Sequence, residues 1–148
     1  MTSPSRAPNN QVLDCRLALA LLVWSDELRE AGVVEIEHIS TYRPGARVHR
    51  VGVPSGHARA MAIDIARFRR GDGTTLDVEE LWSGAERGVA PCEATEDESE
   101  DLATLRRLVC AVAAREMFQI VLTPHYDRPH RNHVHLELRP EVDWTFLR

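Results

Sequence analysis

Hydrophobic and polar residues recur with two different periods along this chain, and each period predicts its own type of element. Over residues 10–31, apolar residues recur at the three- and four-residue spacing of a helix, with Asn10 as its cap and Gly32 just beyond its end. A short helix is expected at Val78–Trp82 and a longer one at residues 100–117. The stripes expected to face the core are Val12, Cys15, Leu19, Leu22 and Val23 in the first helix, and Leu102, Leu105, Val109 and Val112 in the last.

Strands are predicted where the period falls to two residues. Residues 33–41 alternate with Val34 and Ile36 on one face, and residues 61–68 place Ile63 and Ile65 opposite Asp64. Residues 118–122 form another strand, and the G-D-G at 71–73 marks a tight turn. Residues 46–56 and the acidic run 84–101 are expected to be loops. Residues 1–9 read as a disordered leader, so residues 10–148 are left as a single domain.

The most distinctive stretch is residues 130–139, HRNHVHLELR. In a strand, His133, His135 and Glu137 would share one face, and the three apolar residues between and after them would share the other. One imidazole can bind Zn²⁺, and a second beside it can accept a proton from water. The strand therefore offers a ligand and a base, although a His-rich strand facing solvent would show the same pattern. Glu137 either orients one of the histidines or faces solvent.

A second group of candidate ligands lies upstream. His57 stands in a Gly-containing loop, and Asp64 follows on the next predicted strand. With His135 they make three protein ligands, the number typical of catalytic zinc sites that keep one position open. The three cysteines, Cys15, Cys92 and Cys110, contain no C-x-x-C and can form at most one disulfide; whether Cys92 and Cys110 form it is left open.

Composition narrows the range of partners. The net charge is -5, with 18 basic and 23 acidic residues, and the arginines are scattered, which disfavours nucleic acid. The longest apolar run, residues 17–24, is too short to span a bilayer, and the first ten residues lack the apolar segment of a secretion signal. We therefore expect no nucleic-acid partner, no membrane insertion and no secretion signal in this chain.

Residues 55–65, SGHARAMAIDI, resemble the S-x-H-x-x-G-x-A-x-D motif of the M15 D-alanyl-D-alanine carboxypeptidases. Together with H-x-H, they are similar to a wider group of zinc peptidases that includes lysostaphin-type endopeptidases and hedgehog domains. The chain most resembles bacterial extensin-like C-terminal domains, which share a Cys-containing first helix, a Y-R turn, a Cys-bearing second helix and a V-L-x-P ending followed by H-R-D-H-x-H-L-x-L. The resemblance covers about residues 15–139.

The resemblance implies roles for particular residues. His57, Asp64 and His135 would bind Zn²⁺, and His133 would be the base that activates a zinc-bound water. Arg43, in the T-Y-R-P turn, would face a substrate carboxylate or the developing oxyanion, unless it pairs with a surface acid. His130 would be a further active-site histidine or an orienting residue.

Two residues depart from the family pattern. Ala60 stands where the first motif has Gly, and Asn132 stands where the extensin-like ending has Asp. Asn132 cannot act as a base, so either His133 does, or the site is not catalytic.

These features predict an α+β fold like that of the hedgehog and D-Ala-D-Ala peptidase group. A small central antiparallel sheet would carry helices on one side and a zinc site on its open face. The expected function is that of a zinc metallopeptidase, either a carboxypeptidase or an endopeptidase, acting on peptidoglycan stem or cross-bridge peptides in the bacterial envelope. The competing hypothesis is a non-catalytic, zinc-containing module that binds cell-wall peptide.

Overall fold

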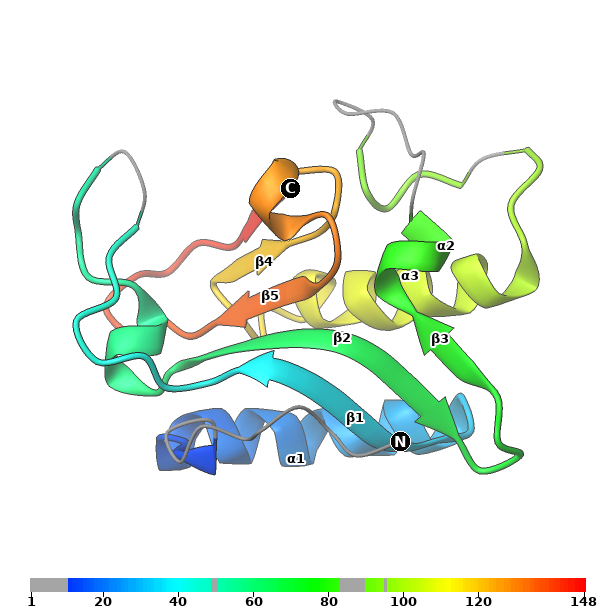
Figure 1. Ribbon diagram of the computed structural model, residues 1–148, viewed down its shortest axis with the longest axis horizontal. Helices are drawn as coiled ribbons and strands as arrows, with labels where there is room; N and C mark the ends of the chain where they lie inside the picture. The colour runs from blue at the N-terminus through cyan, green and yellow to red at the C-terminus, as the bar shows by residue number, and fades with distance from the viewer. Residues whose placement is uncertain (1–10, 49–50, 83–89, 95) are drawn as a thin grey trace.

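The structure is a computed structural model that describes residues 11–48, 51–82, 90–94 and 96–148 (Figure 1). It has the predicted α+β architecture, with a six-stranded sheet packed against helices. The helices are α1 (Cys15–Glu30), α2 (Val78–Trp82) and α3 (Glu100–Ala114). Two 3-10 helices, η2 (Gly56–Arg59) and η3 (Arg128–His130), lie between β1 and β2 and between β4 and β5. The strands are β1 (Val33–Ser40), β2 (Ala62–Arg70), β3 (Thr75–Asp77), β4 (Ile120–Leu122), β5 (Val134–Glu137) and β6 (Phe146–Leu147). The predicted leader, residues 1–9, and residues 84–89 and 95 of the predicted acidic loop lie outside the described residues.

The strand order is β1-β2-β5-β4-β6, with β3 paired to β2 beyond the end of β5. The predicted turn at residues 71–73 joins β2 to β3 as a hairpin. All pairings are antiparallel except that of β4 with β6, which is parallel and makes the sheet mixed. The predicted central antiparallel sheet is present, and the parallel strand β6 is an edge strand that the sequence did not predict. A two-residue strand is too short to show a period in the sequence, so β6 gave no signal.

The helices α1 and α3 cover one face of the sheet (Figure 1). Alternation along β2 and β5 sends one set of side chains into the core beneath these helices and the other set to the opposite, open face. The core set is Ile63, Ile65, Val134 and Leu136, and it packs with Leu105, Val109 and Val112 of α3. The predicted stripe of α3 and the predicted faces of β2 and β5 are thus confirmed.

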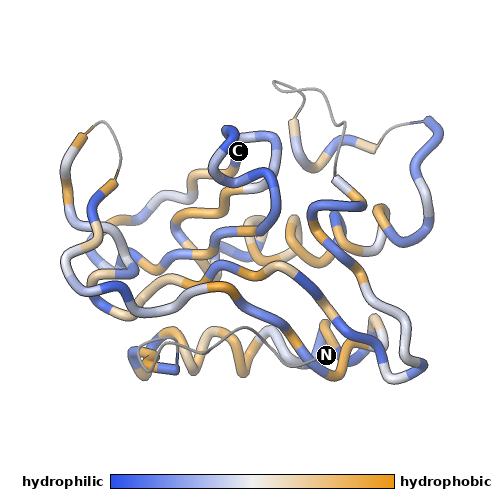
Figure 2. Tube along the Cα trace, in the orientation of Figure 1, coloured by the Kyte–Doolittle hydropathy of each residue, from blue (hydrophilic) through white to orange (hydrophobic). Residues whose placement is uncertain are grey.

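The predicted core face of α1 was wrong. Leu17, Trp24 and Leu28 are buried, whereas Leu19 and Leu22 are 60% and 66% exposed. Val12, Cys15 and Val23 are exposed as well. Figure 2 shows that hydrophobic residues occur along much of α1. The sequence therefore offers two apolar stripes, and the pattern alone does not say which of them is buried. Packing selects the stripe that contains Trp24, whose ring meets Phe68 edge-on at 5.9 Å. The helix also begins later than predicted, with Asp14 as its cap.

The prediction that Val34 and Ile36 share one face of β1 was wrong for a different reason. Val33 is buried and Ile36 packs against the core, whereas Val34 is 70% exposed. The pairing of β1 with β2 contains register shifts, the first of them directly after Val33. An irregularity of this kind inverts the alternation on which the prediction depended.

Two further features answer questions that the sequence raised. Cys92 and Cys110 form a disulfide with their Cα atoms 5.8 Å apart, and Cys15 is free and exposed. Among the described residues, no helix combines the length and the apolar character needed to cross a membrane.

Candidate metal centre

Three elements bring His57, Asp64 and His135 together on the open face of the sheet. Asp64 on β2 lies directly opposite His135 on β5 in the antiparallel register. His57 comes from η2, which begins where the Ser55 hydroxyl accepts a hydrogen bond from the His57 amide and ends at Ala60. All three side chains are buried, with 0%, 4% and 6% of their residue surfaces exposed in sequence order.

The atoms that could bind a metal lie close together. Asp64 Oδ1 is 3.0 Å from His57 Nε2 and 2.8 Å from His135 Nδ1, and the two ring nitrogens are 3.3 Å apart. The three residues form a group able to hold a metal ion, with their ligand atoms all within 4.8 Å of one another. Two nitrogens and one carboxylate oxygen at these positions match the donor set of zinc and related divalent metals.

The tautomers of both imidazoles suit metal binding. His57 Nδ1 lies 2.7 Å from the carbonyl oxygen of Thr41, which can only accept, so Nδ1 donates and Nε2 keeps its lone pair. His135 Nε2 lies 3.1 Å from Glu137 Oε2, which leaves Nδ1 as the nitrogen that faces Asp64. A carbonyl or carboxylate on the far nitrogen is the usual way in which a protein orients a histidine ligand.

Glu137 is 2% exposed and is held by several donors. Its carboxylate receives hydrogen bonds from His135 and from Arg139 Nε, the latter at 2.7 Å. It also accepts one from the Gly56 amide. A Cβ at position 56 would lie 2.5 Å from Glu137 Cγ, so only glycine allows this close approach. Of the two roles considered for Glu137, the structure shows the orienting one.

The group attracts positive charge. Burial alone would raise the pKa of Asp64, but the interactions of its carboxylate with the imidazoles of His135 and His57 outweigh burial and hold the pKa far below its usual value. Burial would likewise lower the pKa of His135, but its hydrogen bonds to Asp64 and Glu137 raise the pKa to about 9. Two facing ring nitrogens and a carboxylate are therefore stable only with a cation among them, either a proton or a metal ion.

His133 borders this group on the open side. Its Nδ1 lies 2.9 Å from Asn132 Oδ1, so Nδ1 donates and Nε2 carries the lone pair. Nε2 is 3.5 Å from Asp64 Oδ1. Burial, opposed by Asp64, lowers the pKa of His133 to about 4, which keeps this imidazole neutral near neutral pH. A neutral imidazole with a free nitrogen is able to accept a proton.

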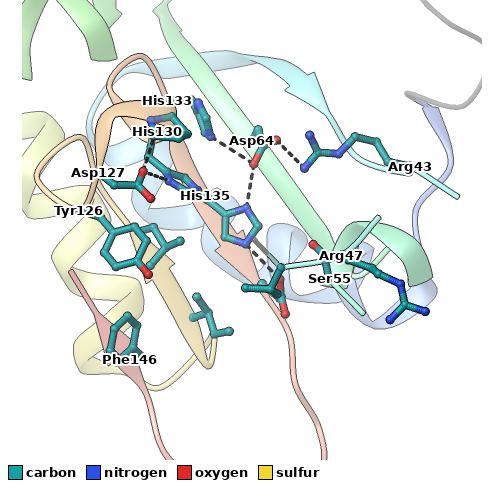
Figure 3. A pocket seen from close by; sticks show the side chains of 15 residues that line it. Arg43, Arg47, Ser55, Asp64, Tyr126, Asp127, His130, His133, His135 and Phe146 are labelled. Atoms are coloured by element: carbon teal, nitrogen blue, oxygen red, sulfur yellow. Dashed lines mark hydrogen bonds and ion pairs between the residues drawn. The ribbon is translucent and has the colours of Figure 1, made fainter. Parts of the chain in front are cut away.

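The structure places the two remaining candidates beside the same group (Figure 3). Arg43 is half exposed, and its guanidinium is 3.7 Å from Asp64 Oδ2, so the acid that it pairs with is the candidate metal ligand. His130 donates through Nδ1 to the carboxylate of Asp127, and its ring centroid is 5.1 Å from that of His133. Both side chains line a pocket of about 400 Å³ that is also lined by two of the candidate ligands, Asp64 and His135.

A family comparison identifies the chain. The model of the family described as extensin-like protein C-terminus matches residues 2–148. The chain belongs to this family. Searches of curated proteins and of solved structures found no match.

In this extensin-like domain, several residues that shape the site gave little signal in the sequence. Thr41 acts through its backbone carbonyl, which every residue possesses. Gly56 acts through the lack of a side chain, and Asp127 lies in a turn where an acid is ordinary. Asn132 stood out in the sequence as a departure from the family, but its contact with His133 depends on the fold of the turn before β5.

Proposed function

We propose that this extensin-like domain is a zinc-dependent peptidase, related to the M15 carboxypeptidases, that hydrolyses amide bonds in peptidoglycan stem or cross-bridge peptides. One observation carries the proposal. Two imidazoles oriented for metal binding and a carboxylate converge at the base of an open pocket, beside a third, neutral imidazole with a free nitrogen. A structural metal site does not need this additional histidine.

The residues fit zinc. His57 Nε2, His135 Nδ1 and Asp64 Oδ1 would hold it, three ligands being the number typical of catalytic sites. Bound zinc would supply a Lewis acid that polarises the scissile carbonyl and lowers the pKa of water. Thr41 and Glu137 keep the two imidazoles in the tautomers that this binding requires.

The remaining polar side chains have roles that follow from their positions. His133 accepts a proton at Nε2, and Asn132 stabilises the proton that stays on Nδ1. Arg43 presents an exposed guanidinium that can donate to a substrate carboxylate or to the oxyanion. His130, held by Asp127, can donate from the opposite wall of the pocket.

The alternative function is a zinc-containing module that binds cell-wall peptide without cleaving it. Asn132 favours this alternative, because a neutral amide stabilises the protonated form of His133 less than a carboxylate would. The alternative keeps the metal and the pocket but dispenses with turnover.

Metal analysis of the purified protein, together with mass spectrometry of muropeptides after digestion of cell-wall sacculi, separates the two functions. The peptidase should contain about one zinc per chain and release peptide fragments. Zinc without release between about pH 5 and about pH 9 would establish the binding module instead.

Variants assign the roles. We expect His57→Ala, Asp64→Ala and His135→Ala each to lower both zinc content and melting temperature, because each loses a ligand that joins separate elements. His133→Ala should keep its zinc and lose turnover by roughly 10²- to 10⁴-fold. The matched control is His125→Ala, since His125 packs against Trp82 and is not among the residues that line the pocket. Wild-type turnover in His133→Ala would move the role of base to His130.

A further inference from the structure

The open face of the sheet carries an apolar row next to the candidate ligands. In the antiparallel register of β4 and β5, Leu122 lies opposite His135 and Ile120 opposite Glu137. Directly paired residues point to the same face, so Leu122 and Ile120 face the pocket. In the parallel pairing at the sheet edge, Phe146 lies opposite Ile120 and extends the row.

The residues that alternate with this row point the other way. Val121 is part of the core, and Leu147 packs against it. Ile120 and Phe146 are half-buried and lie outside the core formed by the described residues, Leu122 is buried with 8% of its surface exposed, and all three line the pocket. The open face of a sheet with one packed side is ordinarily polar, so an apolar row there calls for a ligand or another covering group.

Tyr126 completes the row as a wall. Its ring meets that of Phe146 edge-on, with centroids 6.1 Å apart, and meets His130 at 5.5 Å. The guanidinium of Arg148 lies over the Phe146 ring, 5.0 Å from its centroid. These contacts hold the aromatic side chains at the rim of the pocket, and Tyr126 remains 43% exposed.

The row and the cationic side of the pocket lie on opposite sides of the ligand group. Figure 3 shows Tyr126 and Phe146 on one side of His135, and Arg43 and Arg47 on the other. A bound chain that crosses the ligand group therefore meets an apolar surface on one side and guanidinium groups on the other.

We propose, resting on the peptidase function above, that Leu122, Ile120, Phe146 and Tyr126 form a subsite for an aliphatic side chain of the substrate. The preferred substrate class is thus a peptide with an aliphatic residue next to the cleaved bond.

The experiment uses the zinc-loaded full chain and two sets of fluorescently labelled stem-type peptides. Each set contains three peptides in which one residue next to the scissile amide is Gly, D-Ala or D-Val. In the first set the varied residue lies on the amino side of the scissile amide, and in the second set it lies on the carboxyl side. Fluorescence anisotropy gives the Kd, and mass spectrometry follows cleavage in the same samples. In one of the two sets, the D-Val peptide should bind roughly tenfold more tightly than the Gly peptide, as expected for a partly open apolar pocket.

Variants connect that preference to the row. Phe146→Ala and Ile120→Ala should each reduce the ratio of the two Kd values to about threefold or less without loss of zinc. Phe146→Leu should keep it, because the surface stays apolar. Trp144→Ala is the matched control, since Trp144 is an exposed aromatic residue near β6 that is not among the pocket-lining residues.

The outcomes for the subsite and for the peptidase function can be told apart. A binding preference that both variants abolish establishes the subsite even when no peptide is cleaved, and only the peptidase function then fails. Cleavage with no preference in either set overturns the subsite and leaves the peptidase function standing. A preference that survives in both variants, or the absence of any peptide binding, also overturns the subsite.

Discussion

Single residues in the turn around η2 and after α3 adopt backbone conformations that their side chains do not favour. Ala60 has φ 55° and Glu116 has φ 54°, both in the left-handed region where glycine is preferred. Ala60 ends η2 and thereby fixes the position of His57. The glycine at this position of the M15 motif that the sequence resembles would suit this backbone conformation.

Replacing Glu116 by glycine should stabilise the protein by roughly 0.5–1 kcal/mol, because it relieves the left-handed strain at an exposed position. Ala60→Gly should gain less, since Ala60 is 5% exposed and its buried methyl group contributes about 0.8 kcal/mol. Urea denaturation of both variants measures the difference. A Glu116→Gly protein less stable than the wild type would show that the side chain of Glu116 makes a contribution larger than the strain.

At the scale of elements, α1 shows how far a hydrophobic pattern can be read. Its central residues are apolar on both sides, so the period predicted a helix but not which stripe packs. The alternation in β2 and β5 was unambiguous, and it correctly separated Ile63 and Ile65 from Asp64, and Val134 and Leu136 from His135. Packing partners that lie far away in the sequence decide which stripe of α1 is buried. The faces of β2 and β5 can be assigned from the alternation alone.

The two stripes of α1 should respond differently to truncation. Leu17→Ala should cost about 2–5 kcal/mol, because Leu17 is fully buried in the core. Leu22→Ala, a change of the same volume in the same helix, should stay within about 0.5 kcal/mol, since Leu22 is 66% exposed. Thermal and urea denaturation of the pair test this. A cost for Leu22→Ala close to that of Leu17→Ala would mean that the outer stripe is covered in solution.

Charged side chains join β1 to β2. Glu37 pairs with both Arg67 and Arg69, and although burial opposes it, these hydrogen bonds lower the pKa of the Glu37 carboxyl. A lowered folded-state pKa contributes stability above the unfolded value of about 4.5 and loses it as pH falls through the folded value. At neutral pH, Glu37→Gln should therefore be less stable than the wild type by up to about 1 kcal/mol, the partly exposed pairs being screened by solvent.

The difference in unfolding free energy between wild type and Glu37→Gln, followed from about pH 7 to about pH 3, is the measurement. It should shrink as the pH falls below about 4.5. A difference that stays constant over this range would show that the substitution acts through packing and not through charge.

At the scale of the whole molecule, the three candidate ligands could be found from the sequence because two motifs carry them at fixed spacing. The supports around them could not be found in that way. Nothing in the sequence marks Thr41 as a site residue, yet its backbone carbonyl accepts the hydrogen bond that sets the tautomer of His57. The apolar row became visible only with β6, whose pairing places Phe146 beside Ile120. Contacts made by backbone atoms or by distant strand pairs leave no local pattern.

A disulfide and the candidate metal site lie on opposite sides of this molecule, and when the site holds the proposed zinc their effects on stability should add. The Cys92–Cys110 disulfide ties the segment before α3 to that helix, on the core side of the sheet, across a sequence separation of 18 residues. A loop of that length corresponds to about 3 kcal/mol in the chain-entropy model. The candidate metal site joins η2, β2 and β5 on the open face.

We expect reduction alone to lower the free energy of unfolding by about 3 kcal/mol and to leave the zinc affinity unchanged. Chelation alone should lower it by an amount set by the zinc affinity and concentration. Because the two sites share no residue, both treatments together should equal the sum within about 0.5 kcal/mol. Urea denaturation of the untreated protein, and of the protein with dithiothreitol, with a chelator and with both, provides the four states. Dithiothreitol itself binds zinc, so Cys92→Ser/Cys110→Ser is the control that removes the disulfide without an added thiol. A combined loss well outside the sum would mean that α3 and the ligand group are coupled through the sheet.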